Sequence, residues 1–199
     1  LAPWLQTLQW QVFRDPQPEF GFCFIANFSK SDPFREESTA LLKESGALVM
    51  EEEAPSGDYG DAERTRLWMQ SSFDRLGRLK NDLLQLTLAN KFDGIWLLDS
   101  DVFCDPYTLQ SLMDTDAPIV SALYWTNWQR KVYDSAEFVH AGPQGWLRHP
   151  YILDDARFSE PEFRAALIAR RRLRVGGLGA CTLINRGAIE KGVSFAKLP

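Results

Sequence analysis

The sequence predicts an α/β protein in which a single, mostly parallel sheet is flanked by helices. Apolar segments of strand length alternate along the chain with longer segments of helical periodicity, an order typical of this class. The apolar runs at 20–26 and 94–98 lack the alternation of a strand with one solvated face, which indicates strands buried on both faces. The chain has 199 residues with no internal repeat and no low-complexity linker, so we expect one domain over residues 1–199.

In the first quarter of the chain, turn and capping residues mark the ends of the predicted elements. Residues 1–19 are expected to form a helix or arm followed by a turn, and 20–26 (FGFCFIA) a strand. Ser-Asp-Pro at 31–33 combines an N-cap signal with proline at the first helical position. It predicts a helix that ends at Gly46. The run ALVM at 47–50 then predicts a second strand.

The next part of the chain repeats this order. Residues 62–90 carry leucines at helical spacing, and Gly77 leaves open whether they form one broken helix or two. The run at 94–98 predicts a buried strand, and the segment 105–113, which begins Asp-Pro, predicts another helix. Residues 119–124 predict the strand after it.

Composition narrows the possible functions. The net charge of −5 and the pI near 5.1 argue against nucleic acid as a partner, because binding to its backbone needs a basic surface. Cys23, Cys104 and Cys181 do not have the spacing of a zinc site, so we expect reduced thiols in a cytoplasmic protein. No apolar run reaches the roughly 18 residues of a membrane-spanning helix. Because the chain begins at Leu1 and stops at Pro199, we expect a fragment of a longer protein.

Two carboxylates, Asp99 and Asp101, directly follow the predicted strand 94–98. Ligands of open α/β sheets bind at the carboxyl ends of the strands, and two carboxylates this close repel each other unless a cation lies between them. Asp114 and Asp116 have the same spacing but follow a helix and precede a strand, which places them at the opposite edge. We therefore predict a Mg²⁺ or Mn²⁺ site at the first pair, with a solvated turn as the alternative.

Basic and amide side chains lie in the N-terminal half of the predicted helix 62–90. Helices that follow strands begin at the edge where the strands end, so Arg78, Lys80 and Asn81 are candidates to lie near the aspartates. At about 100° per residue, Lys80 falls within the apolar arc of the helix, an unusual place for a freely solvated lysine. A snorkelling side chain is the alternative interpretation.

These features together resemble a known family. The stretch RLKNDLLQLTLANKFDGIWLLDSDVFCDPYTLQSLMDTDAPIVSALYW at 78–125 resembles the core of a nucleotide-sugar glycosyltransferase with the GT-A fold, similar to family 2. VGGLGACTLINRGAIEKGVSF at 175–195 resembles the segment that returns beneath the donor sugar in those enzymes. The likeness covers roughly 20–125 and 175–199. It implies a single GT-A-like catalytic domain that transfers a hexose from a nucleotide-sugar donor to an acceptor hydroxyl, with Mn²⁺ or Mg²⁺ as cofactor.

The resemblance also implies a role for individual residues. Asp99 and Asp101 would bind the cation together with the donor's diphosphate. The remaining donor-binding residues would contact the base, the phosphates or the sugar: Ala26 and Asn27 at the first strand's end, Arg78 or Lys80 with Asn81, and Gly176 with Gly177. The chain stops before the family's later acidic and histidine residues. Asp154 and Asp155 are then the paired candidates for a base that takes the acceptor's proton.

Two other interpretations stay open. A phosphatase of the haloacid-dehalogenase type also has Asp-x-Asp after an apolar strand, but usually on its first strand. Its motif normally continues with Thr or Val two places after the second aspartate, where this chain has Phe103. A non-catalytic module that binds a sugar or nucleotide on the same fold is the second alternative. The sequence does not identify the acceptor.

Overall fold

The structure is a computed structural model of the chain. It describes residues 1–14, 18–19, 21–29, 32–54, 59–60, 67–68, 70–122, 125–126, 142–143, 165, 169, 171–172 and 180–195.

Helices and strands alternate through most of the described chain. The helices are α1 (Ala2–Gln9), α2 (Arg35–Glu44), α3 (Gln70–Ala89), α4 (Thr108–Met113) and α6 (Arg186–Glu190). The longer strands are β1 (Cys23–Ser29), β2 (Leu48–Ala54), β5 (Gly94–Leu98), β6 (Ile119–Ser121) and β9 (Cys181–Asn185). The two-residue strands are β3 (Tyr59–Gly60), β4 (Leu67–Trp68), β7 (Trp125–Thr126) and β8 (Gly142–Pro143). The expected α/β class is therefore confirmed.

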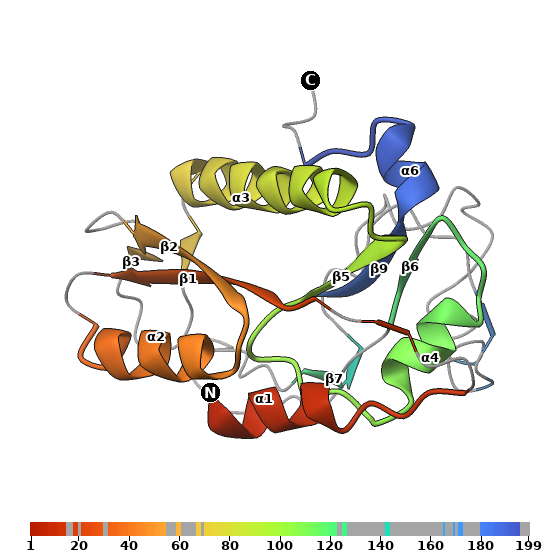
Figure 1. Cartoon of the computed structure of the whole chain (residues 1–199), viewed down its shortest axis with the longest axis horizontal. Helices are drawn as coiled ribbons and strands as arrows, with labels where there is room; N and C mark the ends of the chain where they lie inside the picture. Colours follow the sequence, from red (N-terminus) through yellow and green to blue (C-terminus); the bar gives the residue numbers. More distant parts are fainter. Residues whose placement is uncertain are drawn as a thin grey trace, which may run out of the picture.

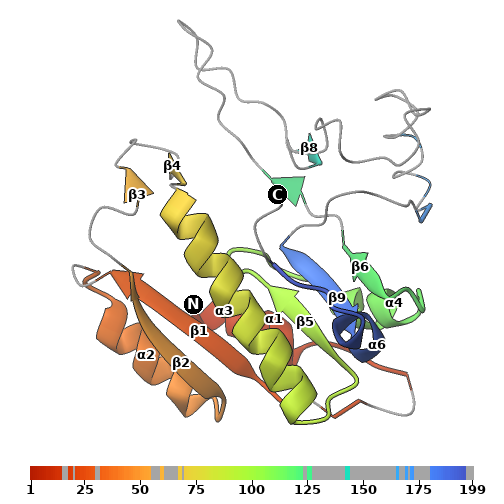
Figure 2. The same ribbon diagram turned by 90° about the horizontal axis from the view of Figure 1, so that it is seen from above.

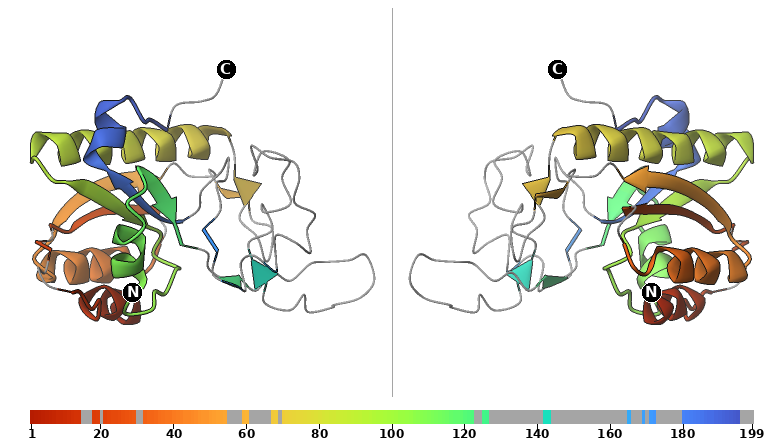
Figure 3. Two further views of the ribbon diagram at one scale, coloured as in Figure 1. Left: turned by 90° about the vertical axis from the view of Figure 1, so that its right-hand side faces the viewer. Right: turned by 90° about the vertical axis from the view of Figure 1, so that its left-hand side faces the viewer.

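The five longer strands form the middle layer of the described structure. Helices α3 and α6 cover one face of this layer, and α1, α2 and α4 lie against the other (Figure 1). Views from the two ends show the same three layers (Figure 3). In Figure 2 the strands follow one another in the order β2, β1, β5, β9, β6, and the arrowheads of β1, β2 and β5 point to one edge. Helix α3 begins at that edge.

The pairing of the strands corrects the predicted sheet. β1 and β2 are parallel, but β9 lies between β5 and β6 and is antiparallel to both. The pairs β3–β4 and β7–β8 are antiparallel as well. The described strands therefore do not show a single, mostly parallel sheet. The reason is that the segment 181–185, which follows the other described strands in sequence, enters between β5 and β6 from the opposite direction.

Several element boundaries also differ from the sequence predictions. The strand expected at 20–26 begins at Cys23, and the helix expected from residue 62 begins at Gln70. Gly77 does not break α3, which is continuous to Ala89. The strand at 94–98 has the predicted bounds, because Gly94 and the carboxylates after Leu98 mark both of its ends.

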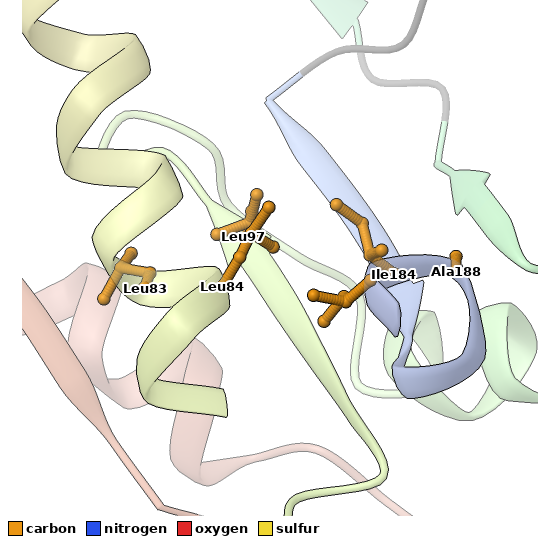
Figure 4. Close-up of a cluster of buried hydrophobic side chains, with 6 residues drawn as sticks. Leu83, Leu84, Leu97, Ile184 and Ala188 are labelled. Atoms are coloured by element: carbon orange, nitrogen blue, oxygen red, sulfur yellow. The ribbon is translucent and has the colours of Figure 1, made fainter. Parts of the chain in front are cut away.

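The core is divided between the two faces of the strand layer. The α3-side cluster packs α3, β5, β9 and α6 together (Figure 4) and consists of Leu83, Leu84, Leu97, Ile184, Ala188 and Ile189. The α4-side cluster consists of Val102, Leu112 and Cys181. Along β5, Ile95 and Leu97 contribute to the first cluster, and Trp96 and Leu98 to the second. This confirms that the strand is covered on both faces, as its unbroken apolar run predicts.

Candidate metal and phosphate site

Asp99 lies immediately after the carboxyl end of β5, where the backbone of β9 fixes its position. Its N–H donates to the carbonyl of Ala180 at 2.9 Å, and its own carbonyl accepts from the N–H of Val102 at 3.1 Å. The chain turns sharply here, and Asp101 is exposed two residues later. The two carboxylates therefore stand at the edge of the strand layer where β1 and β2 also end (Figure 2).

Lys80 of α3 reaches this edge. Its ammonium lies 3.9 Å from Oδ1 of Asp99, and its side chain is only 20% exposed, against 48% for Asp99. The same ammonium lies 5.5 Å from the centre of the Phe195 ring, within the range of a cation–π contact. Lys80 is therefore mostly shielded from solvent, in keeping with its position in the apolar arc of the helix. Its neighbours are an aromatic face and a carboxylate.

The surroundings of Asp99 disfavour its charge. Burial raises the pKa of this carboxyl above its ordinary value of 3.8, Lys80 lowers it in part, and the neighbouring Asp101 raises it again. A single lysine at 3.9 Å thus does not fully compensate the carboxylate. A site of two hard oxygen donors with uncompensated charge fits Mg²⁺ or Mn²⁺ chemically.

This pKa shift gives a testable dependence of stability on pH. Because the folded-state pKa of Asp99 lies above the unfolded value, the folded state binds more protons between the two values, and stability from this group falls as pH rises. The variant Asp99→Asn has no such loss. Its stability relative to wild type is expected to increase as pH rises from 3.8, the ordinary pKa of the group, through the raised pKa of the folded state, in the absence of divalent cations. Urea denaturation at a series of pH values measures this difference, and a difference that shrinks with pH would contradict the assignment.

Arg78 and Asn81 have other partners in the structure. Arg78 pairs with Glu52 at the end of β2 and lies 3.8 Å from Asp82 on its own helix. Asn81 accepts a hydrogen bond at 2.8 Å from the backbone N–H of Phe195. Of the three polar residues predicted on this helix, Lys80 is the one within ion-pair distance of Asp99.

Residues 193–195 cross α3 beside Lys80, a contact that the sequence analysis did not predict. A Cβ on Gly77 would lie 2.6 Å from the Phe195 carbonyl oxygen, so only glycine admits the chain at this distance. The side-chain oxygen of Asn81 accepts a hydrogen bond from the backbone N–H of Phe195. Phe195 thereby places its ring over Lys80, and no local sequence signal marks it for this role.

The other predicted site residues are placed as follows. Ala26 is buried in β1, opposite Glu51 of β2, and Asn27 follows it opposite Glu52. The side chain of Asn27 lies outside the described part of the structure. The same is true of all atoms of four residues, Asp154, Asp155, Gly176 and Gly177.

The described residues supply only part of a metal coordination shell. Within the described ranges, no group of three or more His, Cys, Asp and Glu side chains is arranged to hold a metal ion. Asp99 and Asp101 contribute two donors, so a cation bound here takes its other ligands from water, from a phosphate or from other residues of the chain. Among the helices that the structure describes, none combines the length and apolarity needed to cross a membrane.

Comparison of the chain with protein-family models, with curated proteins and with solved structures found no match.

Proposed function

We propose that this chain is a metal-dependent glycosyltransferase of the GT-A type, which transfers a hexose from a nucleotide-sugar donor to an acceptor hydroxyl. One observation carries the proposal: Asp99 and Asp101 stand at the carboxyl end of β5 with the ammonium of Lys80 beside Asp99. This combination offers oxygen ligands to a divalent cation and a positive charge to a phosphate within one small region. The three free cysteines suit a reducing compartment such as the cytoplasm.

The arrangement around β5 supports this proposal over a phosphatase of the haloacid-dehalogenase type. Four described strands, β1 to β4, precede β5 in the chain, whereas the phosphatase motif usually occupies the first strand. The segment that resembles the family's sugar-binding return, 175–195, contains β9, which pairs with β5 along its whole length. Ala180 in that segment accepts the N–H of Asp99.

In the proposed reaction, Asp99 and Asp101 hold Mn²⁺ or Mg²⁺ together with the donor's diphosphate. Such an ion would neutralise the negative charge that develops on the departing nucleoside diphosphate. Binding requires an ionised Asp99, so affinity rises with pH through its elevated pKa. The proposed role of Lys80 is to donate to a phosphate oxygen, and its position 3.9 Å from Asp99 supports this role.

The remaining roles follow the resemblance and belong to the same proposal. Ala26 and Asn27 approach the nucleotide base, and Gly176 and Gly177 allow the backbone to approach the sugar. If the reaction inverts the anomeric centre, a carboxylate must accept the proton of the attacking hydroxyl. Asp154 or Asp155 is the proposed base.

Titration calorimetry with Mn²⁺ and a panel of UDP, GDP and ADP tests the proposal. We expect one nucleotide to bind wild-type protein only when Mn²⁺ is present, and the variants Asp99→Asn and Asp101→Asn to weaken this binding at least about tenfold, since loss of even an outer-shell partner of a metal ligand has an effect of that size. The matched control is Asp116→Asn, because Asp116 belongs to the second Asp-x-Asp pair, and asparagine tolerates its φ of 51°. Equal binding by wild type and Asp99→Asn would exclude the proposed site. Binding without transfer or hydrolysis of the matching nucleotide sugar would favour the non-catalytic module.

A further inference from the structure

Two of the three cysteines are in direct contact. The Sγ atoms of Cys104 and Cys181 lie 4.0 Å apart, although 77 residues separate them in sequence. Cys181 is the first residue of β9 and is 1% exposed, whereas Cys104 lies in the loop between Asp101 and α4 and is partly exposed. Both are free thiols. Cys104 is therefore the more exposed residue of the pair, and Cys181 is buried.

The two backbones differ in their freedom to move. Cys181 is fixed, because it pairs with Leu98 of β5 and its carbonyl accepts from the N–H of Ala122 at 2.9 Å and from the hydroxyl of Ser121 at 2.8 Å. Cys104 lies outside helices and strands. A disulfide needs the sulfurs at about 2.05 Å, so they must approach by roughly 2 Å. Cys104 takes part in no described strand pairing, so we assign the required movement to its side chain and loop.

We propose that Cys104 and Cys181 form an oxidation-sensitive dithiol that a hydroperoxide converts into a disulfide. One of the two sulfurs, as a thiolate, attacks one peroxide oxygen and becomes a sulfenic acid as the O–O bond breaks and the other oxygen leaves as water or alcohol. The sulfur of the partner cysteine then attacks the sulfenic sulfur, and water leaves as the S–S bond forms. In total, two thiols lose two electrons and two protons to one peroxide.

Cys23 provides an internal comparison for this proposal. It packs against the α3-side cluster, whereas Cys104 and Cys181 belong with the α4-side cluster. Cys23 and Cys104 are separated by 81 positions in sequence, close to the 77 between Cys104 and Cys181. Loop-closure entropy depends only weakly on such a difference. An unfolded chain would therefore form the Cys23–Cys104 and Cys104–Cys181 disulfides to a similar extent. A preference for Cys104–Cys181 would show that the two sulfurs are in contact in the folded protein.

Mass spectrometry of the folded wild-type protein tests the proposal. After brief treatment with hydrogen peroxide, the intact protein is expected to lose two hydrogen atoms, and a non-reducing digest is expected to join the peptides of Cys104 and Cys181. Protein oxidised in urea is expected to lose this selectivity and to form links with Cys23 as well. Addition of oxygen to the folded protein without a link, or a dominant link to Cys23, would overturn the proposal.

Variants provide the matched control. Cys23→Ser is expected to retain the link, whereas Cys104→Ser and Cys181→Ala are expected to abolish it. The digest of the wild-type protein decides between the outcomes even if a variant at the buried Cys181 does not fold. The readout requires neither metal nor nucleotide, so this proposal and the proposed glycosyltransferase function can fail independently.

Discussion

Gly77→Ala is expected to lower the free energy of unfolding by about 2 kcal/mol, within the usual cost of overpacking a tight contact. This is opposite to the ordinary effect, because alanine stabilises an exposed helix interior by roughly 1 kcal/mol relative to glycine. The added Cβ would lie 2.6 Å from the carbonyl oxygen of Phe195, a backbone atom that cannot rotate away. The segment 193–195 must then lift from α3, which also removes the ring from Lys80. Urea denaturation measures the loss.

Gly187→Ala is the matched control for this substitution. Gly187 also lies in a helix, but a Cβ there would meet only the Asn185 side-chain oxygen, at an ordinary distance of 3.6 Å. We expect this variant to be more stable than wild type by about 0.5 kcal/mol. A Gly77→Ala variant as stable as Gly187→Ala would show that the chain does not cross α3 at this position.

Leu84→Ala is expected to destabilise the protein by about 3 to 4 kcal/mol, in the range of large-to-small changes in a closed core. Leu84 is 1% exposed and lies in the α3-side cluster with Leu97 of β5 and Ile184 of β9 (Figure 4). Its removal leaves a cavity between α3 and the strands, and the lining loses contacts as well as apolar burial. Chemical denaturation monitored by tryptophan fluorescence gives the change in midpoint.

The neighbouring exposed position gives the control for that experiment. Gln85 lies on the solvent side of α3, and alanine is the better helix former, so Gln85→Ala is expected to change stability by less than about 0.5 kcal/mol. If Leu84→Ala were equally mild, α3 would not be held against β5 and β9 in the way the structure describes.

Local sequence patterns predict the elements whose causes are local. The strand 94–98 has its predicted bounds because an unbroken apolar run stands between a glycine and two carboxylates. The helix predicted to start at Asp105 begins only at Thr108, because the Asp105 side-chain oxygen accepts the N–H of Tyr107 in a turn that precedes the helix. The presence of glycine at position 77, inside a continuous helix, has a distant cause, because the Phe195 backbone fills the space that a side chain would occupy. No pattern within 62–90 contains that information.

Some features of the candidate site could likewise be predicted from local sequence patterns, and others could not. The place of Asp99 and Asp101 follows from the strand before them, and the unusual position of Lys80 on its helix could be seen from the helical period. The hydrogen-bond partner of Asn81 could not be predicted from the sequence, since it is the backbone N–H of Phe195, 114 positions away. The antiparallel direction of β9 was equally hidden, because a short apolar run has the same sequence signature in either direction.

The late position of β9 in the chain has a consequence during synthesis. β5 and β6 leave the ribosome first, and Cys181 follows Ser121 by 60 residues. At about 5 to 20 residues per second, the facing edges of these two strands wait roughly 3 to 12 seconds for the strand that joins them. Unpaired edges recruit strands of other molecules, so the nascent chain is most exposed to aggregation and most in need of chaperones in this interval.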